Sequence, residues 1–313
     1  MKIAIVGAGG IGTWLGLRLA KQHEVSVLAR AATLTAIKQG HWTLSFADGT
    51  PALNQAVAAS DDAHQLGAQD LVLIAVKGQH LNALAPSLLP LIAPHTLILP
   101  AMNGVPWWFT QGFVECATQQ VPLPYEQVLG CVVHASIQNI GPGHATHKMG
   151  NGLIIGEPKG GHSARAAAVV AALSEAGFTT THSDNIRYDI WYKLWGNLTM
   201  NPLSAVTGAT VDKILLDPLL RALCTSAMRE AAAVGARLGC PITQTPEDRH
   251  QVTAKLGAFK TSMLQDVEAG RSIELDVIVT AVHDIAVRLS IPTPSIDAIL
   301  GITRVFAQTR GLY

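Results

Sequence analysis

The fold is decided by one stretch near the start of the sequence, KIAIVGAGGIG at residues 2–12. A run typical of a buried strand leads directly into glycines spaced G-x-G-x-x-G. A helical pattern follows over 11–21, and a second strand-like run covers 25–28. A strand, a glycine turn, a helix and a second strand within about 30 residues are typical of a unit that binds a dinucleotide.

Each glycine of the turn has a distinct expected task. Gly7 permits the tight turn, Gly9 lets a pyrophosphate approach the backbone, and Gly12 lets the helix pack closely on the strand. The free amides at the start of the helix then face the anion. A glycine-rich turn without a ligand is the alternative. The predicted cofactor contacts are Gly7, Ala8, Gly9, Gly10, Ile11 and Gly12.

The end of the second strand indicates which dinucleotide is bound. NAD-binding versions usually place Asp or Glu there, where it bonds the ribose 2′-hydroxyl. This chain has Ala29-Arg30 instead, and its nearest acid, Glu24, precedes the strand. A guanidinium can form paired hydrogen bonds with a 2′-phosphate. Arg30 therefore favours NADPH over NADH, with a solvated surface arginine as the alternative.

The rest of the chain predicts two domains. Apolar runs at 71–76 and 96–99, separated by helix-compatible residues, predict an α/β domain with a parallel, doubly wound Rossmann-type sheet. Strands at 128–137, 153–155 and 179–181 and a helix at 163–176 complete this domain, which we place at 1–184. Helical periodicity dominates afterwards and predicts an all-helical domain at 185–313. Residues 111–127 form a polar loop, either a surface excursion or a flap over a cleft.

Composition excludes several classes of protein. The chain has 313 residues, of which 49% are hydrophobic, and its 22 Lys plus Arg balance 22 Asp plus Glu. No basic stripe indicates nucleic-acid binding, and no apolar run is long enough to span a membrane. No signal peptide is evident either. The four cysteines lack metal-ligand spacing, so we expect no metal site and a cytoplasmic protein with reduced thiols. They are Cys116, Cys131, Cys224 and Cys240.

Two polar residues follow predicted strands at the edge where such a sheet binds its ligand. Lys77 ends the run at 71–76 and could contact a cofactor ribose or a substrate carboxylate. It could equally lie in solvent. Asn103 begins an Asn-Gly pair, which also favours a simple turn.

A polar stripe on one predicted helix is more informative. Lys193, Asn197 and Asn201 recur every four residues, so they share one helix face. Trp191 and Trp195 belong to the adjoining apolar arc and could desolvate the lysine. Asparagine costs a helix up to ~0.7 kcal/mol relative to alanine, so two of them on one face favour a cleft wall. A solvated face is the alternative. Further on, Ser262 and Glu274 could each face a ligand, but their spacing fits no general catalytic template, and on the residues alone surface positions explain them better.

In order, these elements resemble the ketopantoate reductase family over nearly the whole chain. The resemblance includes the glycine turn, Val76-Lys77, Asn103-Gly104 and a Gly-Pro-Gly turn at 141–143. Its most specific elements are K-x-x-x-N-x-x-x-N-P-L at 193–203, TSMLQD at 261–266 and E-x-D at 274–276.

The resemblance implies a dinucleotide domain, a helical domain and a substrate cleft between them. It implies that Lys193 is the general acid and that Glu274 binds the substrate hydroxyl and holds the active geometry. Lys77 and Asn103 would lie near the nicotinamide ribose, and Arg30 would bind the 2′-phosphate. The expected substrate-binding residues are Asn103, Asn197, Asn201 and Ser262.

The activity implied by the resemblance is NADPH-dependent reduction of a small 2-oxo acid, with 2-dehydropantoate as the leading substrate and pantothenate biosynthesis as the context. Hydride transfer leaves negative charge on the ketone oxygen, which requires a proton-donating cation. A D-2-hydroxyacid dehydrogenase for a bulkier substrate is the alternative, favoured by Trp107 and Trp108 if they line the cleft. A non-catalytic NADPH sensor is the alternative of another class. A homodimer is compatible with the apolar helical half.

Overall fold

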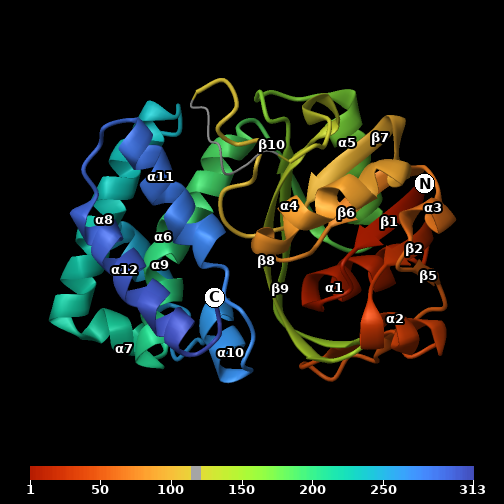
Figure 1. Ribbon diagram of the computed structural model, residues 1–313, viewed down its shortest axis with the longest axis horizontal. Coiled ribbons are helices and arrows are strands. Elements are labelled where there is room, and N and C mark those ends of the chain that lie inside the picture. Colours follow the sequence, from red (N-terminus) through yellow and green to blue (C-terminus); the bar gives the residue numbers. More distant parts are fainter. Residues whose placement is uncertain (114–120) are drawn as a thin grey trace. The chain divides into compact units, whose positions relative to one another are not determined.

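The computed structural model describes residues 1–113 and 121–313 (Figure 1). The chain forms two compact units. The first comprises Met1–Met102 and Gln120–Ile186, and the second comprises Asn103–Gln119 and Arg187–Tyr313. The middle of the loop expected at 111–127 lies outside the described residues.

The second unit includes a segment that lies within the first domain predicted from the sequence. The amide of Val105 donates to the carbonyl of Val277 at 2.7 Å. Phe109 is fully buried and stacks on Trp191, with ring centroids 5.7 Å apart. These contacts explain why the start of this segment belongs to the second unit. They join residues that are far apart in the sequence, so the order of elements along the chain does not indicate them. The predicted boundary at 184/185 remains a prediction.

The first unit contains the predicted parallel sheet, in the order β5-β2-β1-β6-β7. All of its strands run parallel, and Ile3 in the central strand pairs with Val25 on one side and Leu71 on the other. Because the chain moves outward from β1 in both directions, the carboxyl ends of β1 and β6 form the switch point where such sheets bind ligands. The strands are β1 Lys2–Val6, β2 Glu24–Leu28, β5 Ala58–Ser60, β6 Gln69–Ile74 and β7 Ile92–Pro100.

A second sheet in the same unit was not predicted as such. Its order is β10-β9-β3-β4, and β8 pairs with β9 in a long antiparallel hairpin. The strands are β3 Thr43–Phe46, β4 Leu53–Asn54, β8 Gly130–Gly141, β9 His144–Gly156 and β10 Thr179–Ser183. The helices and helical turns of the unit are α1 Gly10–Leu19, α2 Ala31–Lys38, α3 Ala63–Leu66, η1 Gly78–His80, α4 Leu81–Leu84, η2 Ala85–Leu91, η4 Tyr125–Gln127 and α5 Ala164–Glu175.

Helix α1 contacts both sheets, and Figure 1 shows the strands of the long hairpin passing close to it. Trp14, Leu15 and Leu17 point in different directions from the helix axis, yet each is at most 1% exposed. A helix that is buried all round has no polar face, which explains why this segment shows little amphipathic pattern. A Cβ at Gly16 would lie 2.3 Å from the Trp42 ring, so the packing here requires glycine.

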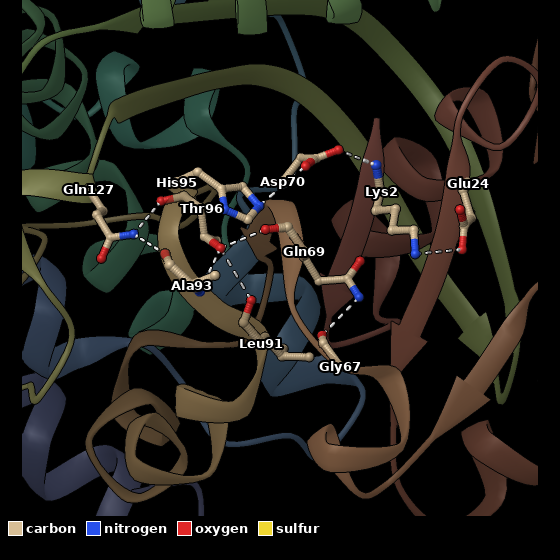
Figure 2. Close-up of polar contacts among 10 residues, drawn as sticks. All are labelled: Lys2, Glu24, Gly67, Gln69, Asp70, Leu91, Ala93, His95, Thr96 and Gln127. Atoms are coloured by element: carbon tan, nitrogen blue, oxygen red, sulfur yellow. Dashed lines mark hydrogen bonds and ion pairs between the residues drawn. The ribbon is translucent and has the colours of Figure 1, made fainter.

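The edge of the parallel sheet opposite the switch point is held by a polar network, which Figure 2 shows. The buried hydroxyl of Thr96 donates to the Gln69 carbonyl at 2.6 Å and accepts from the Ala93 amide at 2.8 Å. The Gln127 side chain donates to the carbonyls of Ala93 and Thr96 at 2.6 and 2.7 Å. The network holds the first half of β7 in place. Its side chains bond to backbone groups of the sheet, so we interpret it as structural rather than as a ligand site.

We expect Thr96→Val to lower the free energy of unfolding by about 1–3 kcal/mol, because the isosteric side chain leaves the Gln69 carbonyl and the Ala93 amide without their partner. Urea denaturation of the purified protein measures this. Thr35→Val is the matched control, since Thr35 is exposed on α2, and we expect a change below about 0.5 kcal/mol. An equal loss in both variants would contradict a structural role for the network.

The regular elements of the second unit are all helices within its described residues, which confirms the predicted class of this half. None of the helices within 1–113 and 121–313 has the length and apolar character needed to cross a membrane. The helices are α6 Ile186–Thr207, α7 Val211–Leu216, α8 Pro218–Arg237, α9 Pro246–Ala254, α10 Ser262–Glu268, α11 Ala281–Arg288 and α12 Pro294–Thr309. A turn of π-helix, η5 Asp276–Thr280, leads into α11.

Candidate active site

Three predicted site residues from distant parts of the sequence meet in the second unit. The ammonium of Lys193, on α6, donates to Asn103 Oδ1 at 2.9 Å. Asn103 Nδ2 in turn donates to Glu274 Oε2 at 3.3 Å. All three residues are partly buried. The amide of Asn103 therefore links the expected general acid to the expected carboxylate.

The chemistry of the two outer groups determines how the Asn103 amide is oriented. An ammonium can only donate hydrogen bonds, and an ionised carboxylate can only accept them. Asparagine offers an acceptor and a donor on one short side chain, so it can serve both neighbours at once. Aspartate in its place would have no donor for Glu274. The residue type at 103 thus fits this position for a reason beyond its preference for turns.

The Asn103-Gly104 turn is held against the segment that follows Glu274. Gly104 has φ +80°, in the left-handed region that favours glycine. A Cβ at Gly104 would lie only 2.2 Å from the Val277 carbonyl oxygen, the same oxygen that accepts from the Val105 amide. Close approach of the two backbones places Asn103 beside Glu274. A π-helical turn such as Asp276–Thr280 is rare and often accompanies functional sites.

The expected desolvation of Lys193 by two tryptophans is wrong. The Trp191 and Trp195 indoles donate to the carbonyls of Ala231 and Met228 at 3.1 and 2.6 Å. Both rings are thus directed into the core against α8. Lys193 is two residues from each, about 200° around the helix, and so projects from the other side of α6.

The remaining predicted substrate residues lie toward the end of α6 and on α10. Asn197 is partly buried on α6, whereas Asn201 is only 4% exposed. The Asn201 Nδ2 has no hydrogen-bond partner among the described residues. A buried amide donor without a partner lowers the stability of the fold, and a bound ligand with an acceptor atom would supply the missing hydrogen bond. Ser262 is exposed at the first position of α10.

A buried pair of hydroxyls ties α10 to α6. The hydroxyls of Ser204 and Thr261 are 2.5 Å apart, and Thr261 also accepts from the Leu264 amide as the N-cap of α10. Ser204 is three residues beyond Asn201, and Thr261 precedes Ser262. The pair therefore brings the two predicted substrate residues to the same end of α6. Sequence reasoning missed Ser204, because nothing in its local pattern distinguishes it from other helix serines.

In the first unit, the glycine turn has the geometry that the sequence predicted. Gly7 has φ +91°, and a Cβ at Gly12 would lie 1.9 Å from the Gly7 carbonyl oxygen. A Cβ at Gly10 would crowd the carbonyl of Ile137 at 3.0 Å. Gly9 differs, since nothing lies within 4 Å of a Cβ placed there. The backbone conformation requires glycine at position 7 and packing requires it at position 12, whereas Gly9 leaves room that a ligand can fill.

The start of α1 is suited to an anion. Its N-cap, Gly9, provides no side-chain hydrogen bond, and no acidic residue lies in the first turn. The first amides of a helix have no partner within the helix and carry partial positive charge. Ala8 and Ile11 flank Gly9 and Gly10 in this turn, so the residues present fit a pyrophosphate.

The two predicted cofactor cations follow strands of the same sheet. Arg30 is exposed directly beyond β2, and Ala31 after it has the unusual φ of +49°. Lys77 follows β6 and precedes the short helical turn Gly78–His80. Glu24 is at the opposite end of β2, paired with Lys2 at 4.0 Å. With no carboxylate beyond β2, the strand end fits a phosphate better than a bare 2′-hydroxyl.

Trp107, Trp108 and three of the cysteines are buried or partly buried. Trp108 is 1% exposed and packs near Phe109, so the expectation that it lines a cleft is wrong, while Trp107 is partly exposed. Cys131, Cys224 and Cys240 are buried, and burial raises the pKa of the Cys224 thiol to about 11. Cys116 lies outside the described residues. Within the described ranges no cluster of His, Cys, Asp and Glu is arranged to hold a metal ion.

Models of one protein family match both halves of the chain. The model described as Ketopantoate reductase PanE/ApbA matches residues 3–160. The model described as Ketopantoate reductase PanE/ApbA C terminal matches residues 185–307. The two matches include every site residue described above.

Individual proteins are similar over the full length of the chain. A 2-dehydropantoate 2-reductase of Mesorhizobium japonicum is 37% identical, with 100% of each chain covered. The crystal structure of a Ralstonia solanacearum MolK2 protein, provisionally assigned as a ketopantoate reductase, is 46% identical with a TM-score of 0.94, covering 100% of this chain and 99% of that one. D-mandelate dehydrogenase with NADH and anilino(oxo)acetate has a TM-score of 0.87 with 100% of each chain covered, but at 21% identity it shows the fold alone.

Proposed function

The chain belongs to the ketopantoate reductase family, and we propose on that premise that it reduces 2-dehydropantoate to (R)-pantoate with NADPH. It is then an NADP-dependent oxidoreductase acting on a CH–OH group. The observation that carries the proposal is the Lys193–Asn103–Glu274 set, with its hydrogen bonds of 2.9 and 3.3 Å. This set provides a held proton donor beside a carboxylate, which reduction of a hydroxylated 2-oxo acid requires.

In this proposal Lys193 protonates the product oxygen. NADPH supplies the hydride, and the ketone oxygen becomes negatively charged as the hydride arrives. The ammonium of Lys193 stabilises that charge and transfers a proton to the oxygen, and the lysine then regains a proton from solvent. Asn103 limits the directions available to the flexible lysine side chain by accepting one of its hydrogen bonds. Such preorganisation reduces the rearrangement needed in the transition state.

The other polar residues bind and orient the substrate. Glu274 accepts a hydrogen bond from the substrate hydroxyl, and Asn103 serves both partners. The buried amide donor of Asn201 gains an acceptor when a carboxylate or carbonyl oxygen binds. Asn197 and Ser262 provide further donors at the same end of the site. A non-catalytic NADPH sensor would have no use for a linked ammonium and carboxylate, so the arrangement favours an enzyme.

In this proposal most of the residues that bind NADPH belong to the first unit. The amides at Gly9, Gly10 and Ile11 hold the pyrophosphate, and Gly9 leaves the space for it. Arg30 is proposed for the 2′-phosphate, and Lys77 and Asn103 are proposed for the nicotinamide ribose. Ketopantoate reductases typically use NADPH, in agreement with the basic residue beyond β2.

We expect Arg30→Ala to raise the KM for NADPH roughly 10- to 100-fold, because a hydrogen bond to a charged group contributes about 1.5–3 kcal/mol. The KM for NADH should change less than about twofold, since NADH lacks the 2′-phosphate. Initial rates with each cofactor at saturating 2-oxo acid measure both. A similar rise for NADH would show that Arg30 acts on something other than the 2′-phosphate.

The proposal is tested by identifying the product. Purified protein is incubated with NADPH and 2-dehydropantoate, and the pantoate formed is quantified by chiral chromatography against the NADPH consumed. One (R)-pantoate for each NADPH supports the proposal. Consumption of NADPH without pantoate, or formation of the (S) enantiomer, contradicts it. Cytoplasmic location, homodimer formation and the absence of nucleic-acid binding remain predictions.

A further inference from the structure

Glu274 is held on both sides by residues that the catalytic proposal does not use. The amide of Ile273, immediately before it, donates to the Leu312 carbonyl at 2.9 Å. Asp276, two residues after it, accepts a hydrogen bond from the Tyr313 phenol through Oδ1 at 2.6 Å. Consecutive residues 312 and 313 thus hold the backbone before the carboxylate and the side chain after it.

The path of the chain beyond α12 places these two residues. Gly311 has φ +67° and ends the helix with a left-handed residue, and the Leu312 amide donates back to the Ala307 carbonyl at 2.9 Å. This pattern is the Schellman helix end, which reverses the chain direction. Leu312 is only 5% exposed, so its burial anchors the reversal and directs Tyr313 toward Asp276.

The same short segment contacts the turn that carries Asn103. The Val277 carbonyl accepts from the Val105 amide at 2.7 Å, as described above. The Thr280 hydroxyl donates to Asp276 Oδ1 at 3.1 Å, so one carboxylate oxygen receives both Thr280 and Tyr313. Residues 273–277 therefore connect the Asn103 turn on one side with Leu312 and Tyr313 on the other.

We propose that Tyr313 is a positioning residue for Glu274, acting through Asp276. The phenol fixes the Asp276 side chain at the first residue of the π-helical turn, and the Leu312 carbonyl fixes the backbone before Glu274. Together they hold the carboxylate where Asn103 Nδ2 reaches it at 3.3 Å. Burial, followed by the hydrogen bond to Asp276, raises the pKa of the Tyr313 phenol to about 12. This inference rests on the proposed role of Glu274.

A double-mutant cycle tests the proposal. Tyr313→Phe removes only the phenol oxygen, and we expect kcat/KM for 2-dehydropantoate to fall roughly tenfold, within the ~100-fold that a small misplacement of a catalytic group can cost. In a Glu274→Gln background the same change should have less than about a twofold effect, because the group that Tyr313 positions is already altered. An equal loss in both backgrounds would overturn the proposal, as would no loss in the unaltered background.

Tyr192→Phe is the matched control. It removes a phenol of the same unit that donates at the same distance of 2.6 Å, but to Gln244 Oε1 rather than to a residue of the 273–280 segment. We expect its effect on kcat/KM to be the same in both Glu274 backgrounds. The affinity for NADPH and the urea midpoint should be unchanged in Tyr313→Phe, since the Tyr313 side chain is about half exposed.

Hydrogen exchange decides the inference without any substrate. We expect amide exchange over residues 273–280, measured by mass spectrometry, to be several-fold faster in Tyr313→Phe and unchanged in Tyr192→Phe. Unchanged exchange in Tyr313→Phe would overturn the positioning role. Absence of pantoate formation by the unaltered protein would instead contradict the proposed function, so the two failures are distinguishable.

Discussion

Replacing Lys193 with alanine is expected to lower kcat for 2-dehydropantoate about 10²–10⁴-fold, the usual contribution of a positioned general acid. The loss has two physical causes: the charge that develops on the ketone oxygen is no longer stabilised, and the proton must come from water. Asn103 also loses the ammonium that it accepts from at 2.9 Å. Stopped-flow and steady-state NADPH absorbance measure the effect.

NADPH binding distinguishes a catalytic role for Lys193 from a structural one. The dissociation constant for NADPH in Lys193→Ala should stay within about twofold, because Lys193 is not among the residues proposed to bind the cofactor. Lys213→Ala is the matched control, an exposed lysine on α7 of the same unit, and kcat should be unchanged. An unaffected kcat in Lys193→Ala would remove the residue from the mechanism, and a loss of NADPH affinity would mean that its role is misassigned.

The second large effect is expected from two separate substitutions in the glycine turn, Gly9→Ala and Gly12→Ala. Gly9→Ala should weaken NADPH binding roughly 10- to 100-fold, since a methyl group in the space for the pyrophosphate costs about 1–3 kcal/mol. Its effect on the free energy of unfolding should be below about 1 kcal/mol, because nothing lies within 4 Å of the added carbon. Fluorescence titration with NADPH and urea denaturation measure the two quantities.

In Gly12→Ala the loss of folding stability should be the larger effect and the loss of NADPH affinity the smaller one. Its Cβ would lie 1.9 Å from the Gly7 carbonyl oxygen, a backbone atom that cannot rotate away. We expect the free energy of unfolding to fall by about 3 kcal/mol or more, with cofactor affinity reduced as a consequence. If Gly9→Ala destabilised the protein as much, or left NADPH affinity unchanged, the assignment of the open space at Gly9 to the cofactor would be wrong.

Much of the fold could be predicted from the sequence because its signals are local. The β1–glycine turn–α1 unit, the parallel sheet and the helical second half follow from short-range periodicity. The separate second sheet could not be predicted. Its strand β3 has four residues, and it pairs with β9 about a hundred residues later in the sequence. Strand β4 of this sheet has two residues, and β5 at the edge of the parallel sheet has three, which are too few to show any period.

The candidate site was predictable to a smaller extent. The common face of Lys193, Asn197 and Asn201 is a property of one helix, so spacing indicates it directly. The contact between Asn103 and Glu274 spans 171 residues of sequence, and no local pattern indicates that the two side chains meet. The directions of large side chains depend on packing.

Packing is why expectations about the tryptophans failed. The indoles of Trp191 and Trp195 bond to α8, and Trp108 is enclosed in the core of the second unit. Whether an aromatic side chain faces a ligand or a neighbouring helix depends on which helix packs beside it. The contact of Tyr313 with Asp276 likewise could not be predicted from local sequence, because it depends on the reversal of the chain at Gly311.

The central claim is that this chain reduces 2-dehydropantoate with NADPH. It is tested most directly by kcat/KM for 2-dehydropantoate and for a panel of other 2-oxo acids, including bulky aromatic ones, with NADPH and with NADH. We predict the highest kcat/KM for 2-dehydropantoate with NADPH and a much lower value with NADH. Negligible turnover of 2-dehydropantoate beside strong turnover of another 2-oxo acid would contradict the claim.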